Sequence, residues 1–196
     1  GCGKTTLLRI IAGLDFADQG QILLEGDDAS ARHVRDRHVG FVFQQYALFK
    51  HMTVAKNIAF GLDVRKGKDK PSKAEIAQRV EDLLKLVELD GLGKRYPSQL
   101  SGGQRQRVCI AMALAGEPKL LLADEPTTAL DADLRGQILD LLARLQRERG
   151  MAVLLISHDL RMVQSFAQRV AAFGGEHRHV LDYLADEVFN RQPQEI

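Results

Sequence analysis

The feature that most constrains the fold of this chain is the pentapeptide LSGGQ at residues 100–104, which the run LLLADE follows at residues 120–125. A short, wholly apolar run of this kind is typical of a strand buried in a parallel sheet. Adjacent glycines at the start of a helix let the backbone approach a phosphate closely, and the helix dipole favours negative charge there. The two segments together predict an α/β protein with a phosphate-binding edge.

The first six residues, GCGKTT, match the last part of the phosphate-binding loop pattern G-x-x-x-x-G-K-[ST]. The residues expected to bind phosphate are Gly1, Cys2, Gly3, Lys4, Thr5 and Thr6. The Lys4 side chain would reach the β- and γ-phosphates, and the Thr5 hydroxyl would bind Mg²⁺. For this short match alone, an accidental G-K-T before a helix is an equal alternative. Because Gly1 occupies the fourth position of the pattern, we expect an N-terminally truncated chain that lacks its first strands.

Composition limits the class of protein. A length of 196 residues predicts one domain, with room for an inserted subdomain. The formal net charge of +1 argues against a nucleic-acid partner. Two cysteines, Cys2 and Cys109, do not form a disulfide framework, which favours a reducing compartment. The sequence contains no apolar run of the roughly 20 residues that span a bilayer, and no signal peptide.

Helical and strand patterns alternate along the chain. We expect helices at residues 4–14, 104–115 and 131–149, and strands at residues 21–24, 38–43, 120–123 and 152–156. Gly26, Asp27 and Asp28 predict a turn after the first of these strands. Such alternation predicts a core with a parallel sheet.

The segment between residues 45 and 103 has a helical character instead. Ser72 and Glu75 form the sequence signature of a capping box, which predicts a helix that starts after Ser72. Apolar residues follow at helical spacing, at Ile76, Val80, Leu83, Leu84 and Val87. We therefore expect a helical insertion.

Taken in order, these motifs resemble the ATPase subunits of ABC transporters over nearly the whole chain. The order is the phosphate loop, Gln44 after a strand, LSGGQ, the acidic pair Asp124 and Glu125, and His158 after another strand. The resemblance implies a single ABC ATPase domain over residues 1–196, with a P-loop NTPase core and a parallel sheet. Residues 1–44 and 104–196 would form the ATP-binding core, and residues 45–103 the α-helical subdomain.

The resemblance also implies roles at the strand ends. Glu125 resembles the catalytic glutamate that polarises the attacking water, and His158 resembles the histidine that contacts the γ-phosphate. Gln44 resembles the glutamine that touches both the water and Mg²⁺, although Gln45 lies beside it. The Mg²⁺ ligands would be Thr5, Gln44 and Asp124. The alternatives are an acidic pair that caps a helix before the proline at 126, and an exposed loop amide at position 44.

ATP itself would bind between two subunits. In the family the LSGGQ signature faces the ATP of the opposite subunit, which places Ser101, Gly102, Gly103 and Gln104 at the nucleotide. Asp131 resembles the aspartate of the loop that links the two sites. The cofactors implied are therefore ATP and Mg²⁺, and the implied assembly is a homodimer or a pair of ATPase subunits. We expect Arg105 and Arg107, just after the signature, to lie on a solvated helix face.

The family's other partners are transmembrane permease subunits and, indirectly, a periplasmic solute-binding protein. These would place the chain on the cytoplasmic face of the inner membrane. The apolar patch formed by Tyr46, Ala47, Leu48, Phe49 and Met52 would be the groove that receives a permease helix. Internal packing of these side chains is the alternative.

The chain resembles two branches of the family, and the two branches suggest different transported solutes. Residues 7–64 and 95–107 resemble the ATP-binding subunits of sulfate and thiosulfate importers, whereas residues 110–160 are more similar to peptide and nickel importers. The sulfate branch usually has phenylalanine and glycine where this chain has Thr127 and Thr128, and threonine in place of Ser157. We expect ATP-driven import of sulfate or thiosulfate, with peptide or nickel import second. A soluble ABC ATPase and an inactive fragment are the remaining alternatives.

Overall fold

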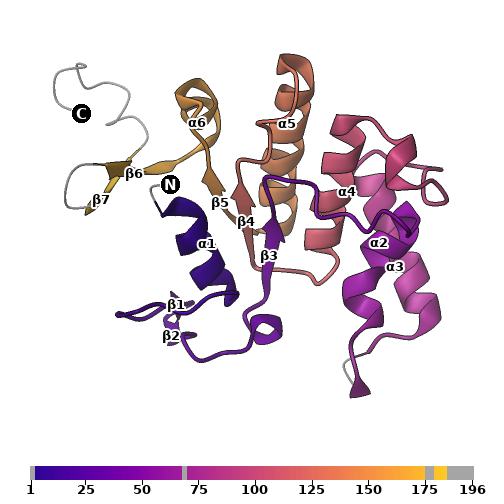
Figure 1. The fold of residues 1–196 in the computed structure, drawn as a ribbon, viewed down its shortest axis with the longest axis horizontal. Coiled ribbons are helices and arrows are strands. Elements are labelled where there is room, and N and C mark those ends of the chain that lie inside the picture. Colours follow the sequence, from indigo (N-terminus) through magenta and orange to yellow (C-terminus); the bar gives the residue numbers. More distant parts are fainter. Residues whose placement is uncertain (1–2, 68–69, 175–178, 185–196) are drawn as a thin grey trace.

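The central feature of the fold is a parallel sheet of three strands (Figure 1). The computed structural model describes residues 3–67, 70–174 and 179–184. Strands β3 (Val39–Val42), β4 (Leu120–Asp124) and β5 (Ala152–Ile156) pair in the order β3-β4-β5. Val42 lies opposite Ala123, and Asp124 lies opposite Ile156, so the strands end at one edge. The predicted parallel sheet is confirmed.

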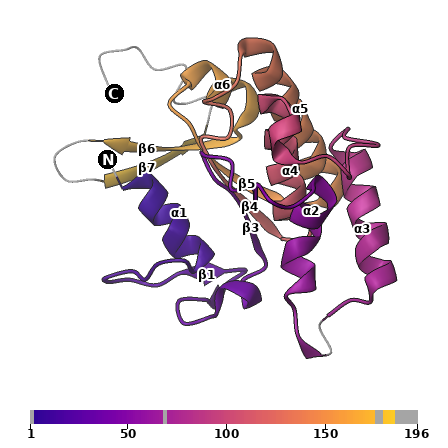
Figure 2. The same ribbon diagram turned by 45° about the vertical axis from the view of Figure 1, so that its right-hand side comes forward.

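Helices cover both faces of this sheet (Figure 2). On one face, Leu8 and Ala12 of α1 (Lys4–Ala12) pack with Leu122 of β4. On the other face, Leu121 and Ala123 join a larger core with helices α4 (Gly102–Leu114) and α5 (Ala132–Arg149). Alternate residues of β4 thus face opposite layers, as the period of a strand requires. Helix α6 (Leu160–Phe166) follows β5.

A helical segment lies beside the sheet and shares the larger core with it. It contains α2 (Val54–Asp63), α3 (Lys73–Leu86) and a 3-10 turn at Pro97–Gln99. The capping box predicted for α3 is present, because the Ser72 amide donates to Glu75 Oε2 at 2.7 Å and the Glu75 amide donates to Ser72 Oγ at 3.2 Å. Helix α4 contacts α2 and α3 as well as β3, so it joins the helical segment to the sheet.

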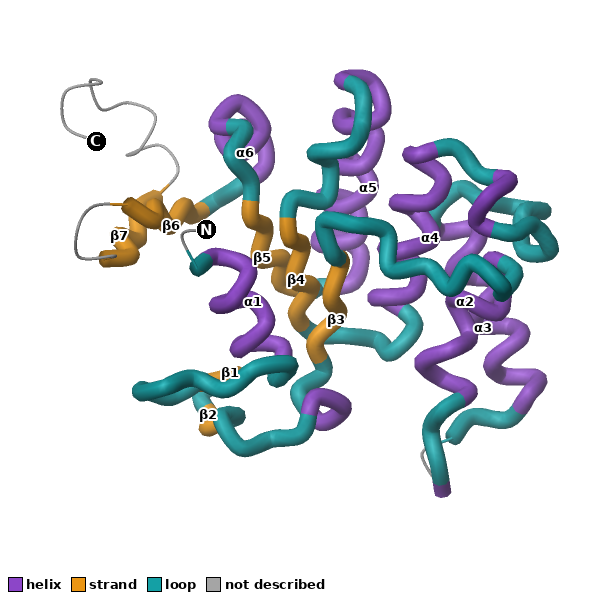
Figure 3. The backbone as a smooth tube through the Cα atoms, in the orientation of Figure 1, coloured by secondary structure: helices purple, strands orange, loops and turns teal. Residues whose placement is uncertain are grey.

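Two hairpins lie outside the main sheet (Figure 3). Strands β1 (Leu23–Leu24) and β2 (Asp27–Asp28) are antiparallel and short. The turn between them is formed by Glu25 and Gly26, whose φ angles of 55° and 87° suit the tight turns of hairpins. The turn predicted at Gly26, Asp27 and Asp28 is thus correct at Gly26 and wrong at Asp27 and Asp28, which form β2, because the turn begins one residue earlier, at Glu25. A 3-10 turn follows at Val34–Asp36.

The second hairpin consists of β6 (Arg169–Gly174) and β7 (His179–Leu184), which pair antiparallel. Within the part of the chain that the structure describes, no helix has the length and apolar character needed to span a membrane.

Arg37 ties the end of α1 to the segment that follows it. Its buried guanidinium donates to the carbonyl oxygens of Ile10 and Ile11 at 2.7 and 3.0 Å, and to those of Ser30 and Arg32 at 3.0 and 3.2 Å. The first two bonds are to carbonyls in the last turn of α1, where a helix end leaves acceptors unsatisfied; the Ile10 oxygen also accepts from the Gly13 amide at 3.0 Å. The α1 cap residue, Gly13, has a φ of 79°, and a Cβ added there would lie 2.7 Å from Arg37 Nε.

Arg107 of α4 likewise connects separate elements, because its partners lie just after α3 and on α5. It is buried, and it donates to the Val87 carbonyl oxygen at 3.0 Å, to Glu88 Oε2 at 2.7 Å and to Gln137 Oε1 at 3.1 Å. The solvated face predicted for this residue is therefore wrong, because partners from the end of α3 and from α5 enclose its side chain. Arg105 is only partly exposed, and its guanidinium lies 5.6 Å from the centre of the Tyr46 ring.

Strand β3 approaches helix α4 unusually closely at Gly40. A Cβ added at this position would lie 2.7 Å from the backbone oxygen of Ala113 and 3.1 Å from Leu121 Cδ1. Because a backbone oxygen cannot swing away as a side chain can, the close contact requires glycine.

Candidate functional site

Several of the predicted site residues lie at the edge where the three parallel strands end. Asp124 is the last residue of β4. Gln44 follows the end of β3 by two residues, and His158 follows the end of β5 by two. Figure 1 shows the N-terminal end of α1 at the same end of the sheet. Ligands of open α/β sheets bind outside the carboxyl ends of the strands, so this edge is the candidate site.

The start of α1 carries the residues that match the phosphate-binding loop pattern. Gly3 precedes the helix with a φ of 80°, and no side chain caps the first amides there. Lys4 and Thr5 open the helix, and Thr6 is exposed on its first turn. Gly1 and Cys2 lie outside the described residues. Uncapped amides at a helix start, together with a lysine, can bind an anion.

Thr5 and Asp124 are in direct contact, although 119 positions separate them in the sequence. The Thr5 hydroxyl donates to Asp124 Oδ2 at 2.8 Å, and Asp124 is 5% exposed. The described residues contain no group of three or more His, Cys, Asp or Glu side chains that could hold a metal. A hydroxyl and one carboxylate instead fit Mg²⁺, which takes few protein ligands and completes its shell with water and phosphate oxygens.

The side chain of Glu125 lies beside this pair and is mostly buried, with 17% exposed. Its Oε2 accepts a hydrogen bond from the Thr128 hydroxyl at 2.7 Å and lies 3.0 Å from His158 Nδ1. Burial raises the pKa of the Glu125 carboxyl, but the contacts with Thr128 and His158 and the charge of Lys4 together lower that pKa below its usual value. The group is therefore ionised at neutral pH and can accept a proton or orient a water molecule.

The backbone at Glu125 is also unusual. Its φ is 47°, in the left-handed region that residues other than glycine rarely adopt. A turn follows, in which Pro126 takes the second position and the Thr128 amide donates to the Glu125 carbonyl oxygen at 3.3 Å. The sequence analysis missed Thr128 as a site residue. A hydroxyl three residues after the glutamate, with proline between them, is the signal that could have indicated it.

The signature residues do not join this cluster. Ser101 caps α4, where its amide donates to Gln104 Oε1 at 3.0 Å and its Oγ accepts from the Gln104 amide at 3.2 Å. A Cβ at Gly102 would lie 3.4 Å from Tyr46 Oη, and one at Gly103 would lie 3.0 Å from Leu134 Cδ2. Among the described residues, the structure gives the signature no hydrogen bond to the start of α1 or to Glu125.

Asp131 and Gln44 stand apart from the cluster as well. Asp131 caps α5, and its Oδ1 accepts from the Leu134 amide at 2.9 Å. Gln44 and Gln45 are both exposed. Their exposure does not show which of the two is the predicted site residue. The structure thus brings together Lys4, Thr5, Asp124, Glu125 and His158 within one subunit.

The apolar patch is partly used inside the molecule. Tyr46 and Leu48 pack against the large core. Phe49 lies 4.5 Å from Phe60 of α2, measured between ring centres. Asn57, which is buried, accepts from the Phe49 amide at 2.8 Å. Ala47 is exposed, so the segment presents only part of its apolar surface to a partner.

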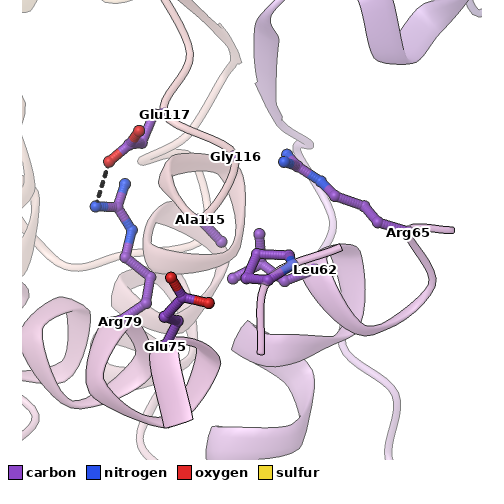
Figure 4. Close-up of a pocket in the computed structure, with 8 residues that line it drawn as sticks. Leu62, Arg65, Glu75, Arg79, Ala115, Gly116 and Glu117 are labelled. Atoms are coloured by element: carbon purple, nitrogen blue, oxygen red, sulfur yellow. Dashed lines mark ion pairs between the residues drawn. The ribbon is translucent and has the colours of Figure 1, made fainter. Parts of the chain in front are cut away.

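A cavity of about 200 Å³ lies away from the strand ends (Figure 4). It is bounded by α2, α3 and the loop before β4, and an ion pair between Arg79 and Glu117 closes one side of it. None of the predicted site residues lines this cavity. This cavity is therefore separate from the candidate site.

Comparison with known proteins identifies the class. The solved structures that resemble this one include a dimeric ATP-binding cassette in a post-hydrolysis state bound to ADP and Pi, with a TM-score of 0.75 and 35% identity, over 87% of this chain and 75% of that one. Another is cbiO1 from Clostridium perfringens, part of the ABC transporter complex cbiONQ, with a TM-score of 0.83 and 31% identity over 96% of this chain and 75% of the other. The fold is that of an ABC ATPase domain.

The family follows from the sequence comparison. A family model described as "ABC transporter" matches residues 1–128, and the chain belongs to that family. It is 64% identical over 171 residues, or 87% of its length, to the sulfate/thiosulfate import ATP-binding protein CysA of Caulobacter vibrioides. It is 58% identical over 99% of its length to CysA of Neisseria meningitidis. The chain spans 50% and 54% of these two relatives, or about half of their length.

Proposed function

We propose that this chain binds and hydrolyses ATP as part of a bacterial ABC importer for sulfate or thiosulfate. The observation that carries the proposal is the arrangement of Lys4, Thr5, Asp124 and Glu125 at one sheet edge, in a chain of the ABC transporter family. The relatives named sulfate/thiosulfate import proteins support the choice of solute. Their alignments extend over 87% and 99% of the chain, so they include much of the segment that resembles peptide and nickel importers.

Each residue of the cluster has a proposed task. Lys4 and the first amides of α1 bind the phosphates. The Thr5 hydroxyl and the Asp124 carboxylate hold Mg²⁺, which would neutralise charge on the transferred phosphoryl group. Glu125 orients and polarises the attacking water, for which an ionised carboxylate is required. Gln44 and His158 complete the site at the ends of β3 and β5, toward the water and the γ-phosphate.

The remaining predicted residues act across a dimer. Ser101, Gly102, Gly103 and Gln104 lie at the start of a helix and, among the described residues, form no hydrogen bond with the cluster of their own subunit, so we assign them to the ATP of a second subunit. Asp131 lies in the loop between the two sites. The ADP-bound structural relative is described as dimeric, which supports a homodimer or a pair of ATPase subunits.

Partners and location follow from the same family. We propose transmembrane permease subunits as direct partners, a periplasmic solute-binding protein as an indirect one, and the cytoplasmic face of the inner membrane as the location. The structural relative described as part of an ABC transporter complex supports this arrangement. Peptide or nickel import is the alternative function.

The catalytic proposal is tested with Glu125→Gln and Lys4→Ala in the full-length protein. Glu125→Gln keeps the shape of the side chain but loses its charge, and we expect turnover to fall by about 10² to 10⁴ while ATP still binds. Size-exclusion chromatography with Mg-ATP should then show a stable dimer, whereas Lys4→Ala should form none. Glu148→Gln, an exposed glutamate of α5, is the matched control. Near wild-type ATP hydrolysis by Glu125→Gln would remove Glu125 from the catalytic role.

The solute is tested in cells. The full-length gene should restore growth on sulfate to a strain that lacks its sulfate-importer ATPase. Rescue of a dipeptide-importer defect instead would favour the alternative.

A further inference from the structure

The Glu125 carboxylate is held through one of its two oxygen atoms. The Thr128 hydroxyl and His158 Nδ1 both contact Oε2, and neither of these contacts uses Oε1. A glutamate side chain has three rotatable bonds, so its carboxylate points in one direction only if something restrains it. Restraint through Oε2 leaves Oε1 available to a water molecule.

The two contacts differ in how firmly they restrain the carboxylate. His158 is 67% exposed on a separate strand end, and its contact depends on which ring nitrogen carries the proton. Thr128 lies in the same tight turn as Glu125, where its own amide donates to the Glu125 carbonyl oxygen at 3.3 Å. The turn therefore fixes the backbone that carries the Thr128 side chain, and a hydroxyl always has a proton to donate.

We propose that Thr128 is a positioning residue for ATP hydrolysis: its hydroxyl holds Glu125 through Oε2 so that Oε1 faces the attacking water. This inference rests on the proposed function, in which Glu125 acts on that water. Thr128 itself touches neither water nor nucleotide in this arrangement. An enzyme accelerates a reaction when it holds the reacting groups in the productive geometry, because misplaced groups react more slowly.

The backbone and side-chain contributions of Thr128 can be separated by mutation. Thr128→Val keeps the branched shape and the amide that closes the turn, but it removes the hydroxyl. Thr128→Ser keeps the hydroxyl and removes a methyl group. Thr127→Val is the matched control, because the buried Thr127 hydroxyl donates to Met162 Sδ at 3.4 Å and does not contact Glu125.

The first measurement is steady-state hydrolysis by the full-length protein, together with nucleotide affinity by calorimetry. A hydrogen bond to a charged group is lost in Thr128→Val, so we expect kcat to fall by about tenfold while the Kd for Mg-ATP changes by less than about twofold. Thr128→Ser should restore most of kcat, and Thr127→Val should leave both quantities at wild-type values.

The second measurement needs no activity. A crystal structure of nucleotide-free Thr128→Val should show the Glu125 carboxylate in other rotamers, whereas Thr128→Ser should retain the contact with Oε2. Wild-type kcat in Thr128→Val, or a Thr128→Ser variant as slow as Thr128→Val, would overturn the positioning role. Failure of the proposed function would look different, because Glu125→Gln would then hydrolyse ATP as fast as the wild type.

Discussion

At the scale of single residues, the structure depends on buried cations that satisfy backbone oxygens. The Arg37 guanidinium makes four hydrogen bonds to carbonyl oxygens, two of them at the end of α1. A planar guanidinium can direct several donors to separate acceptors, which the ammonium group of lysine cannot do with the same geometry. The charge alone therefore does not explain why arginine is needed here.

Arg37→Lys should consequently destabilise the protein even though it keeps the charge. A lysine ammonium cannot reach all four carbonyl oxygens with this geometry, so several hydrogen bonds would be lost, and we expect the free energy of unfolding to fall by about 2–3 kcal/mol. Urea denaturation followed by circular dichroism measures this change. Arg35→Lys is the control, because Arg35 is exposed and its contacts are limited to His33. Equal midpoints for the two variants would contradict the assignment.

At the scale of secondary-structure elements, helix ends decide where the chain changes direction. Gly13 and Gly150 both end a helix in the left-handed conformation, with φ angles of 79° and 60°. Glycine is favoured at this position because a side chain costs about 1 kcal/mol there. The two sites differ in their surroundings, since a Cβ on Gly13 would meet Arg37 Nε at 2.7 Å and a Cβ on Gly150 would meet nothing within 4 Å.

This difference makes a matched pair of substitutions informative. Gly150→Ala should cost about 1 kcal/mol of stability from backbone strain alone. Gly13→Ala should cost at least about 1 kcal/mol more, because Arg37 is held by four hydrogen bonds and cannot move aside freely. Thermal and urea unfolding of both variants give the comparison. Similar losses would show that Arg37 relaxes easily.

At the scale of the whole molecule, Arg107 connects the helical segment to the rest of the core. Its partners lie at the end of α3 and on α5, and Arg144 of α5 donates to Leu86 and Glu88 at the same junction. The Arg107 guanidinium lowers the pKa of the Glu88 carboxyl through its hydrogen bond, so this link is present at neutral pH and is lost only as the pH falls through this lowered pKa, below the usual range of a glutamate.

Removing Arg107 should therefore loosen the junction. Arg107→Ala leaves the Val87 carbonyl without its donor, and we expect a loss of about 2–3 kcal/mol in the free energy of unfolding. Arg105→Ala should cost less than about 1 kcal/mol, because it removes only a cation–π contact with Tyr46 and a long hydrogen bond, of 3.4 Å, from Arg105 Nε to the Ser101 carbonyl oxygen. Denaturant titrations at pH 7 compare the two. A larger loss for Arg105→Ala would contradict the role given to Arg107.

Much of this architecture could be predicted from the sequence, for identifiable reasons. The strands β4 and β5 and the helix α5 have strong apolar patterns, and the capping box at Ser72 involves residues only three positions apart. Residue spacing within each segment was therefore enough to predict these elements. The contact between Thr5 and Asp124 follows from the order of motifs. Burial of Arg107 could not be predicted, because its partners are distant in sequence. The strand at Asp27 was missed, since two residues carry no periodicity.

The close contact at Gly40 has a mechanical consequence. Strand β3 leads directly to Gln44, and α4 runs from Ser101 at its N-terminal end to Ala113 near its C-terminal end. Both residues proposed to contact nucleotide, Gln44 and Ser101, therefore belong to elements that meet at the close contact between Gly40 and Ala113. A helix of 13 residues is about 20 Å long. The backbone of Gly40 lies against the Ala113 carbonyl oxygen, near one end of α4. A slight tilt there would sweep the opposite end of the helix through a much larger arc.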